Sequence, residues 1–315
     1  MRCSIVVPVF NKARFIADSL SSVLRQRCED FEIVVIDDGS TDGSAELARA
    51  LDDARVRVFV QANGGVSAAR NAGISQARGD LVFFFDADDW MHPDYLRIQL
   101  EQAERFPQVD FFATRFLRFP AEMPAPQVWE LRGPPDARLI DDLPAAWRTG
   151  QTFITSSVAI RRQVLLGLQP CFPLGESKGE DMDLWFRTGE RGPLCLTDAP
   201  LVGYREGSPG NLSSQQPDAL FPPYLQRLES RARSGGLSAA LARSSLRFVA
   251  EARTTQARVL MSQGRRFAAM RCLARAGAAA GRPRWWLSWL MAALFPADTI
   301  ARWEQSRIER TQVRL

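Results

Sequence analysis

The sequence predicts an α/β fold, in which a mostly parallel sheet is flanked by helices, followed by an α-helical appendage at the C-terminus. Short apolar runs alternate with helical patterns over about the first ninety residues, and polar side chains follow each apolar run. The composition then changes near residue 225. Alternating strands and helices are typical of a parallel sheet covered on both faces.

Each element of this alternation has its own signal. Apolar residues that recur on one helical face, such as Phe15, Leu20 and Val23, predict a helix. Short runs rich in β-branched residues predict strands. We therefore expect strands over residues 3–8, 31–36, 55–60 and 80–85, and helices over residues 13–26, 42–50 and 65–77.

Polar residues follow all four expected strands, at Asn11, Asp37-Asp38, residues 61–63 and residues 86–89. Open α/β sheets bind ligands at the carboxyl ends of their strands. A shared ligand crevice is therefore favoured over four unrelated loops. The chain has no G-x-G-x-x-G after the first two strands and no P-loop motif, which argues against a dinucleotide-binding domain and a P-loop NTPase.

The most informative motif is Asp86-Ala87-Asp88-Asp89, directly after the apolar run 81–85. Buried carboxylates at a strand end are costly unless a cation lies beside them. Carboxylates one residue apart on a strand point the same way, so Asp86 and Asp88 can chelate one hard divalent cation. We expect a Mg²⁺ or Mn²⁺ site here. The alternative is an acidic turn that caps a helix beginning near Pro93.

The second strand end carries Asp37-Asp38-Gly39. A carboxylate at this position can accept the imide N–H of a pyrimidine or a ribose hydroxyl, and we favour that role for Asp38. The alternative is that Asp37 or Asp38 only organises the turn at Gly39. Asp42 is expected to cap the next helix.

Four blocks of sequence together resemble family 2 glycosyltransferases with the GT-A fold, of the non-processive bacterial cell-envelope type. They occur in the family's order and with similar spacing, and the resemblance extends over about residues 1–210. The blocks are residues 4–12, 37–42, 63–73 and 86–89.

The resemblance implies a nucleotide-sugar donor, with a UDP-sugar favoured, and a glycan or lipid-linked acceptor. By position, Asp38 would contact the base, Asp86 and Asp88 would bind the metal, and the metal would neutralise the leaving diphosphate. For Arg70 an internal ion pair is the alternative to a donor contact. For Arg205, a histidine that many members carry nearby is missing. The residues expected to bind the donor are Pro8, Phe10, Asn11, Asp38, Gly65, Arg70, Asp86 and Arg205.

Residues 179–187 resemble the acidic segment that begins the helix under the family's acceptor site. Asp181 matches the position of the catalytic base, and Glu180 would orient it or bind the acceptor. An inverting transfer needs such a carboxylate to take the proton of the attacking hydroxyl. The alternative is that these carboxylates only favour the first turn of a helix.

Charge divides the chain near residue 225. Residues 225–315 hold 17 arginines, no lysine and five acidic residues, a net charge of +12, whereas residues 1–224 carry a net charge of −8. We expect a catalytic domain over residues 1–224, with a nucleotide-sugar-binding half (1–115) and an acceptor-binding half (116–224). An Arg- and Trp-rich helical tail is expected over residues 225–315, after a turn-rich stretch.

The tail contains an apolar run over residues 285–295, which is shorter than the ~20 residues that a membrane-spanning helix needs. Tryptophans in the run and Arg282, Arg284 and Arg302 beside it favour a helix that lies at a membrane surface, within residues 282–315. The alternative is a helix packed back on the catalytic domain. Amphipathic helices are expected before it, over residues 237–261 and 265–279. Nucleic-acid binding is disfavoured because the first domain is acidic.

Five cysteines without a C-x-x-C pair argue against a zinc site or a disulfide framework and fit a reducing compartment. The first apolar run is too short for a signal peptide. We expect a cytoplasmic protein, peripheral on the inner face of the cell membrane. Trp129 and Trp147 can stack on an acceptor sugar or pack in the core, and His92 is expected to be structural.

Alternative functions remain open. A polyprenyl-phosphate sugar synthase is one, although the metal motif lacks the Asp-Leu-Gln continuation typical of that class. A catalytically inactive sugar-nucleotide- or glycan-binding protein is another, against which the intact acidic motif and Asp181 argue. A third is an interaction protein that acts through its basic tail. A processive synthase is disfavoured because no Q-x-x-R-W block occurs.

Overall fold

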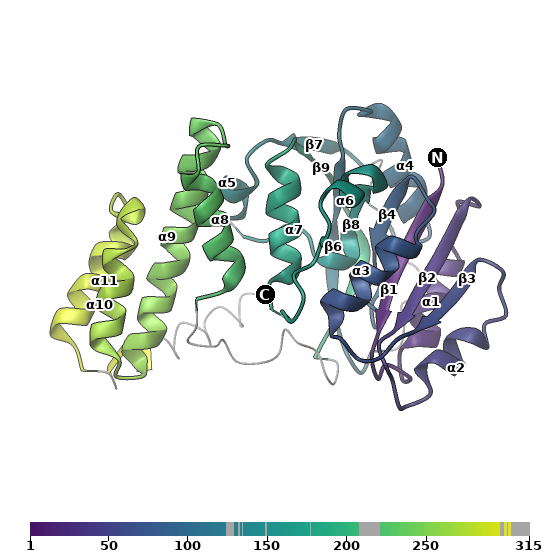
Figure 1. Cartoon of the computed structure of the whole chain (residues 1–315), viewed down its shortest axis with the longest axis horizontal. Coiled ribbons are helices and arrows are strands. Elements are labelled where there is room, and N and C mark those ends of the chain that lie inside the picture. The colour runs from purple at the N-terminus through teal and green to yellow at the C-terminus, as the bar shows by residue number, and fades with distance from the viewer. Residues whose placement is uncertain are drawn as a thin grey trace. The chain divides into compact units, whose positions relative to one another are not determined.

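The computed structural model describes residues 1–123, 129–131, 133, 135–148, 150–176, 178–207, 221–296, 299–300 and 302–303. The chain divides into two compact units, residues 1–215 and 216–315 (Figure 1). The expected boundary at residue 224 needs correction, because it falls within helix α8 (Pro223–Arg233). The arginine-rich sequence begins inside that helix, after the second unit has already begun at residue 216.

The first unit alternates strands and helices over its first hundred residues, as predicted, and most elements are shorter than expected at their ends. Its strands are β1 (Cys3–Val9), β2 (Phe31–Asp37), β3 (Val56–Val60), β4 (Leu81–Phe84), β5 (Trp90–Met91), β6 (Phe111–Pro120), β7 (Ala137–Ile140), β8 (Val158–Arg161) and β9 (Leu194–Glu206). Its helices are α1 (Ile16–Leu24), α2 (Ser44–Arg49), α3 (Val66–Gln76), α4 (Tyr95–Arg105), α5 (Leu143–Trp147), the 3₁₀ helix η1 (Thr155–Ser157), α6 (Arg162–Gly167) and α7 (Glu180–Gly189).

One mixed sheet runs through this unit in the order β3-β2-β1-β4-β8-β6-β9-β5, and β7 also pairs with β9. Strands β1 to β4 pair in parallel, which confirms the predicted parallel sheet, whereas β8 joins β4 and β6 in antiparallel fashion. The sheet continues across the expected division at residue 115, which falls inside β6 and therefore does not separate two halves.

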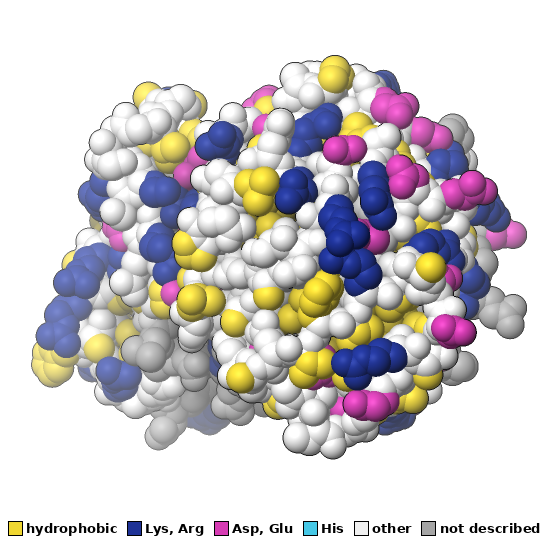
Figure 2. Space-filling model, turned by 45° about the vertical axis from the view of Figure 1, so that its right-hand side comes forward, with side chains coloured by type: hydrophobic (Ala, Val, Ile, Leu, Met, Phe, Trp, Pro, Cys, Tyr) yellow, Lys and Arg dark blue, Asp and Glu magenta, His cyan; other side chains and the backbone are white. Residues whose placement is uncertain are grey.

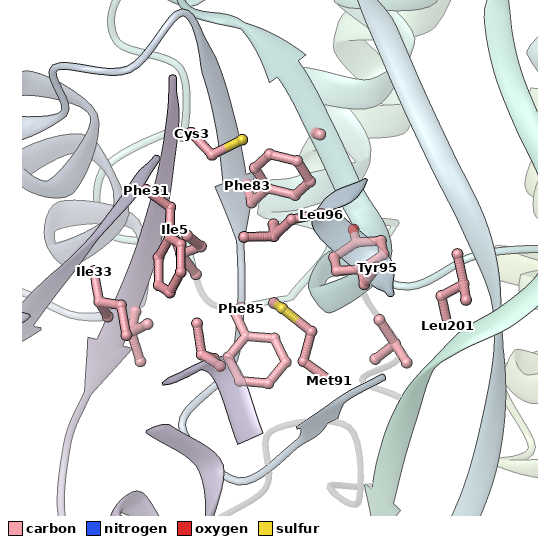
Figure 3. Packing of buried hydrophobic residues seen from close by; sticks show 14 of the residues in the cluster. Cys3, Ile5, Phe31, Ile33, Phe83, Phe85, Met91, Tyr95, Leu96 and Leu201 are labelled. Carbon is pink, nitrogen blue, oxygen red and sulfur yellow. The ribbon is translucent and has the colours of Figure 1, made fainter. Parts of the chain in front are cut away.

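Helices α1 and α4 cover one face of the sheet, because alternate strand residues point toward them. Ile5 and Phe83 belong to the same buried cluster as Leu20 of α1 and Tyr95 of α4. The rings of Phe83 and Tyr95 meet edge to face, with 5.4 Å between their centroids (Figure 3). This aromatic core fixes β4 and therefore the start of the acidic motif that follows it.

Helix α3 packs on the opposite face, against Val34, Ile36 and the neighbouring strand β1. Gly73 permits the close approach, because a Cβ at this position would lie 2.2 Å from Cγ1 of Val6. The tight contact brings α3, and with it the buried Arg70, close to the sheet.

The second unit is helical. The predicted helix over residues 265–279 ends earlier than expected and continues as a single 3₁₀ turn. Among the described residues, no helix is both long enough and apolar enough to cross a membrane. The elements are α8 (Pro223–Arg233), α9 (Ala239–Ser262), α10 (Arg266–Ala274), η3 (Gly277–Ala279) and α11 (Pro283–Leu294).

The surface carries mixed charge. Lysine and arginine side chains are interspersed with acidic and hydrophobic ones on the face shown in Figure 2. Net charge therefore gives little guidance to a binding site, which has to be located from individual contacts.

Candidate active site

The carboxyl ends of β1, β2 and β3 are joined by hydrogen bonds at one edge of the sheet. The amide of Asp38 donates to the carbonyl of Val9 at 2.8 Å, and the amide of Gln61 donates to the carbonyl of Asp37 at 2.9 Å. The strand ends that the sequence singles out are therefore neighbours in space, as the parallel arrangement requires.

Asp38 is buried and organises the loop between β3 and α3. Its Oδ1 accepts hydrogen bonds from Gln61 Nε2 at 2.7 Å and from the amide of Gly64 at 2.9 Å. Its Oδ2 accepts the amide of Gly65 at 2.7 Å. Gly65 has φ of 85°, a left-handed conformation that favours glycine. The turn-organising role is thus present, and the contact of Asp38 with a base stays a prediction.

The segment after β1 supplies an exposed ring beside a fixed turn. Pro8 is half-buried within β1, whereas the side chain of Phe10 is 48% exposed. Asn11 adopts φ of 52°, and its Oδ1 accepts the amide of Thr41 at 2.9 Å. Asn11 therefore ties this loop to the Asp37–Asp42 loop and leaves the Phe10 ring accessible to a ligand.

The acidic motif is a turn and not an extension of the strand. Strand β4 ends at Phe84, and the amide of Asp89 donates to the carbonyl of Asp86 at 3.1 Å. The expected strand alternation of Asp86 and Asp88 is therefore wrong. Asp86 Oδ1 pairs with Arg70 Nη2 at 2.9 Å, whereas Asp88 Oδ2 pairs with Lys12 Nζ at 2.6 Å.

Asp89, the third carboxylate of the motif, is buried. Its carboxylate accepts hydrogen bonds from the Ser156 hydroxyl and, at 3.0 Å, from the amide of Arg205. Burial raises the pKa of Asp89 well above its usual range, and the nearby carboxylates of Asp88 and Asp86 raise it further. The helix-capping alternative for the motif is wrong, because α4 begins only at Tyr95, after Asp94.

The carboxylates of Asp86 and Asp88 are of the ligand type that holds a metal together with a phosphate group. Mg²⁺ is commonly held by one or two carboxylates together with substrate phosphates. Over the described part of the chain, no group of three or more His, Cys, Asp or Glu side chains could hold a metal by itself. The Asp86 side chain is 33% exposed and so accessible to a ligand, while Lys12 and Arg70 already balance part of the negative charge.

Arg70 connects the acidic motif to the start of α7. Its side chain is only 5% exposed, and its Nη1 pairs with Glu180 Oε1 at 2.7 Å in addition to the pair with Asp86. Burial raises the pKa of Glu180, Arg70 opposes this rise, and Asp181 adds to it, so that the net pKa is raised. The internal ion pair considered from the sequence is therefore present.

Asp181 lies next to this pair and is half-buried. Its Oδ2 accepts a hydrogen bond from Thr155 Oγ1 at 2.8 Å, and its Oδ1 accepts the amide of Met182 at 2.8 Å. Glu180 is thus committed to Arg70, whereas Asp181 is held by a hydroxyl from η1.

Sequence reasoning missed the contributions of Lys12 and η1. Thr155 orients Asp181, and Ser156 Oγ both bonds Asp89 and accepts the amide of Asp86 at 3.0 Å. A signal existed, because Thr155-Ser156-Ser157 is a run of three hydroxyl residues between apolar neighbours. Nothing local in the sequence connects that run to the acidic motif.

Arg205 contacts the acidic turn through its side chain. Its guanidinium is 3.9 Å from the centroid of the Trp90 ring, its Nε donates to the carbonyl of Asp88 at 2.8 Å, and its Nη1 donates to the carbonyl of Ala121 at 3.0 Å. The guanidinium of Arg205 thus stabilises the acidic turn. The expected contact of Arg205 with a diphosphate stays a prediction. Residues 208–213, which follow soon after Arg205 in the chain, lie outside the described residues.

The remaining aromatic candidates pack internally. Trp147 is buried against Phe153 and Phe186, so stacking on a sugar is excluded in this arrangement. The indole nitrogen of Trp129 donates to the carbonyl of Pro200 at 2.6 Å. His92 is buried, with its ring against that of Trp129, which confirms a structural role.

Comparison with known proteins identifies the family. The family model described as "Glycosyl transferase family 2" matches residues 4–165, just over half of the chain. "Uncharacterized glycosyltransferase EpsJ" of Bacillus subtilis is 45% identical over 104 residues, which cover 32% of this chain and 30% of that protein. "Glycosyltransferase GlyA" of Streptococcus pneumoniae is 39% identical over 97 residues, or 30% of this chain and 14% of that protein. The aligned part thus spans less than a third of either relative.

Solved structures give the fold over most of the chain. S. aureus TarS 1–349 in complex with UDP-GlcNAc matches with a TM-score of 0.63 and 17% identity, covering 88% of both chains. The complex with UDP matches with a TM-score of 0.57 and 18% identity over the same shares. These likenesses support the GT-A fold. The match of the family model over just over half of the chain shows that the chain belongs to glycosyltransferase family 2.

Proposed function

We propose that the chain transfers a sugar, with inversion at the anomeric carbon, from a nucleotide-diphosphate sugar to a hydroxyl of a saccharide or lipid-linked glycan of the bacterial cell envelope. The observation that carries this proposal is the double ion pair of Arg70. This residue joins Asp86 of the acidic motif to Glu180, next to Asp181, and so holds donor-side and acceptor-side groups in one cluster.

Asp181 is the proposed base. In the reaction its carboxylate takes the proton of the acceptor hydroxyl, and the hydroxyl oxygen bonds to the anomeric carbon. The bond from that carbon to the diphosphate oxygen breaks, and the nucleoside diphosphate leaves with the electron pair. A single displacement of this kind inverts the configuration. The hydrogen bond from Thr155 Oγ1, at 2.8 Å, would hold the Asp181 carboxylate in one orientation.

Asp86 and Asp88 would hold Mg²⁺ or Mn²⁺, which when bound would neutralise the charge of the leaving diphosphate. Arg70 supports the same end from the protein side. Its positive charge lies beside Asp86 and is held in place by both ion pairs.

A UDP-sugar is the favoured donor, because the TarS structures that share this fold contain UDP-GlcNAc and UDP. Pro8, the exposed Phe10 ring, Asn11, Asp38 and Gly65 would form the nucleoside side of the pocket. A polyprenyl-phosphate sugar synthase is the second candidate, since only the acceptor would differ.

The experiment that tests the proposal is release of nucleoside diphosphate from UDP-, GDP- and dTDP-sugars in the presence of Mn²⁺ and a saccharide acceptor panel. Turnover with one nucleotide class supports the proposal, and turnover with polyprenyl phosphate alone supports the second candidate. Donor binding with no turnover against any acceptor would instead support a catalytically inactive binding protein.

We also infer that α11 rests on an anionic membrane surface. Trp286, Leu287, Leu290 and Leu294 are 49–67% exposed and recur at helical spacing, while Ser288 and Ala292 on the other side of the helix are buried. An amphipathic helix with tryptophan on its apolar face and arginine beside it suits the bilayer interface. The excess of arginine in this unit favours anionic lipid. Residues 304–315 of the predicted membrane segment lie outside the described residues.

Flotation with vesicles tests this inference. Wild type should float with phosphatidylglycerol vesicles and much less with phosphatidylcholine vesicles. The variant Leu287→Ser/Leu290→Ser should lose flotation, because both side chains are about half exposed and their removal leaves the core intact. Leu166→Ser/Leu174→Ser changes two comparably exposed leucines of the first unit and should float as wild type does. Equal flotation of both variants would contradict the inference.

A further inference from the structure

The helical second unit contains two adjoining cavities, of about 400 Å³ and about 220 Å³. They share three lining residues, Phe221, Arg253 and Arg275, and therefore form one continuous site, here called the arginine cavity. Its size falls within the range typical of small-molecule sites. None of the residues to which the proposed glycosyl transfer assigns a role lines it.

Three helices each present a polar stripe to the arginine cavity. Residues at i, i+3, i+4 and i+7 lie on one face of a helix. The stripes that line the arginine cavity are mostly polar or basic, and Gln226, Ser230, Arg233, Arg271 and Arg275 among them are exposed. They comprise Gln226, Glu229, Ser230 and Arg233 of α8, Arg253, Gln256 and Leu260 of α9, and Ala268, Arg271, Cys272 and Arg275 from α10 and its C-cap.

Arg253 occupies the junction of the two cavities and is held rigidly. Its side chain is 11% exposed, and its guanidinium carbon lies 4.1 Å from the centroid of the Phe221 ring. Its Nη2 pairs with Glu229. Its Nε is buried without a hydrogen-bond partner among the described residues. These contacts fix the charge of Arg253 beside both cavities.

The arginine cavity carries more positive than negative charge. Glu229 forms ion pairs with two of the arginines that line the cavity. Its Oε1 pairs with Arg233 at 2.9 Å, and its Oε2 pairs with Arg253. Burial raises the pKa of Glu229, but the hydrogen bonds from Arg253 and Arg233 outweigh burial and keep the net pKa lowered. Within the part of the chain that the structure describes, Arg271 and Arg275 form no ion pair. Four arginines therefore face one ionised carboxylate.

We propose that the arginine cavity binds a phosphate group, as a phosphate ester or a diphosphate. The planar guanidinium fork matches two phosphate oxygens at once, and an anion with more than one negative charge balances the excess of arginine. This site is separate from the donor site proposed in the first unit and does not depend on it. The phosphate comes either from a soluble phosphate ester, such as a phosphate-bearing acceptor, or from a lipid headgroup.

Calorimetric titration with pyrophosphate and with glycerol phosphate tests the proposal. Any binding of a probe in the first unit is common to wild type and variant, so only the difference between the two proteins reports on the arginine cavity. Arg271→Gln/Arg275→Gln should weaken binding about tenfold or more, because each change removes charge-assisted hydrogen bonds. Both side chains are exposed and outside any described ion pair, so the variant should keep the wild-type melting temperature.

Arg243→Gln/Arg247→Gln is the matched control. These two exposed arginines of α9 are also four residues apart but do not line the arginine cavity, and the variant should bind both probes as wild type does. Equal affinity of all three proteins, or equal weakening in both variants, would overturn the proposal. Release of nucleoside diphosphate from a nucleotide sugar, measured in parallel, reports on the transfer site of the first unit and keeps the two proposals distinguishable.

Vesicles separate the two sources of phosphate. If the ligand is a lipid headgroup, Arg271→Gln/Arg275→Gln should also lower binding to phosphatidylglycerol vesicles more than the control variant does. If it is a soluble ester, only the titrations should change. Both results support a phosphate site in the arginine cavity.

Discussion

Arg70 Nη1 lies 2.7 Å from Glu180 Oε1, although the two residues are 110 positions apart in the chain. The contact joins α3, which packs on β1, to the first turn of α7. Because Arg70 also pairs with Asp86, a single buried cation determines how the acidic motif and the proposed base are placed relative to each other.

Loss of Arg70 should destabilise the fold. Arg70→Ala would leave the buried Glu180 without its cation, and breaking a buried pair costs about 3–5 kcal/mol. Chemical denaturation measures the change in the free energy of unfolding. Arg49→Ala is the control, because Arg49 and its partner Glu46 are 49% and 74% exposed, and its effect should stay within about 0.5 kcal/mol. An Arg70→Ala variant as stable as this control would contradict the buried-pair account.

Asp181 and Glu180 should respond differently to neutralisation. Asp181→Asn removes the proposed base and should lower kcat by about 10²–10⁴-fold, with KM for the donor little changed. Glu180→Gln keeps a hydrogen-bond acceptor for Arg70 and should lower kcat less. Asp198→Asn, at a position with a 55% exposed side chain, controls for the substitution itself. Full activity of Asp181→Asn would remove Asp181 from the mechanism.

Lys12 should compete with a divalent cation for Asp88. The Nζ–Oδ2 distance is 2.6 Å, and both side chains are mostly buried. Lys12→Met removes the competing charge and should tighten Mn²⁺ binding about tenfold in the absence of donor, as expected for a charge-assisted hydrogen bond. The affinity for Mn²⁺ is measured from the electron paramagnetic resonance signal of the unbound ion. Lys178→Met changes the other lysine of the chain and should have no effect. Weaker Mn²⁺ binding in Lys12→Met would show that the lysine assists the metal.

His92 should contribute to loss of stability in acid. Its Nδ1 accepts the amide of Asp94 at 3.1 Å, and its Nε2 lies 3.1 Å from the carbonyl of Trp129, an arrangement that suits the neutral ring. Burial lowers its pKa below the usual 6.5, so the unfolded chain binds the proton more readily. The stability that the neutral His92 ring contributes is fully present above pH 6.5. It is lost as the pH falls through the lowered pKa of the folded state.

His92→Gln should therefore flatten the dependence of the unfolding free energy on pH below 6.5. Urea denaturation at a series of pH values, each compared with the same variant at pH 8, gives the slope. A slope equal to that of the wild type would mean that other groups account for the acid sensitivity.

The sequence predicted the first four strands and their helices because each is a continuous local pattern. Apolar runs mark β1 to β4, and their polar ends meet as parallel pairing requires. The same local reasoning failed at Asp86, where alternation was extended past the end of β4 into a turn. Alternation holds only within a strand, and the last strand residue is poorly marked in sequence.

Contacts between distant segments could not be predicted in the same way. The pairs of Arg70 with Glu180 and of Lys12 with Asp88 depend on how helices and loops pack on the sheet. The insertion of β8 between β4 and β6 brings Thr155 and Ser156 to the acidic motif. No local sequence pattern predicts this place of β8 in the strand order. The arginine cavity was missed for a related reason. Its arginines gave the tail a net charge, but their common face appeared only when α8, α9 and α10 were packed together.

Metal-dependent binding of a nucleotide sugar is tested by a thermal-shift series with UDP-GlcNAc, GDP- and dTDP-sugars, with and without Mn²⁺, on wild type and Asp88→Ala. A ligand that binds only the folded state raises the melting temperature. We expect a Mn²⁺-dependent rise in melting temperature with one nucleotide class, UDP-GlcNAc above all, that is lost in Asp88→Ala. No rise with any nucleotide sugar, with or without Mn²⁺, would contradict it.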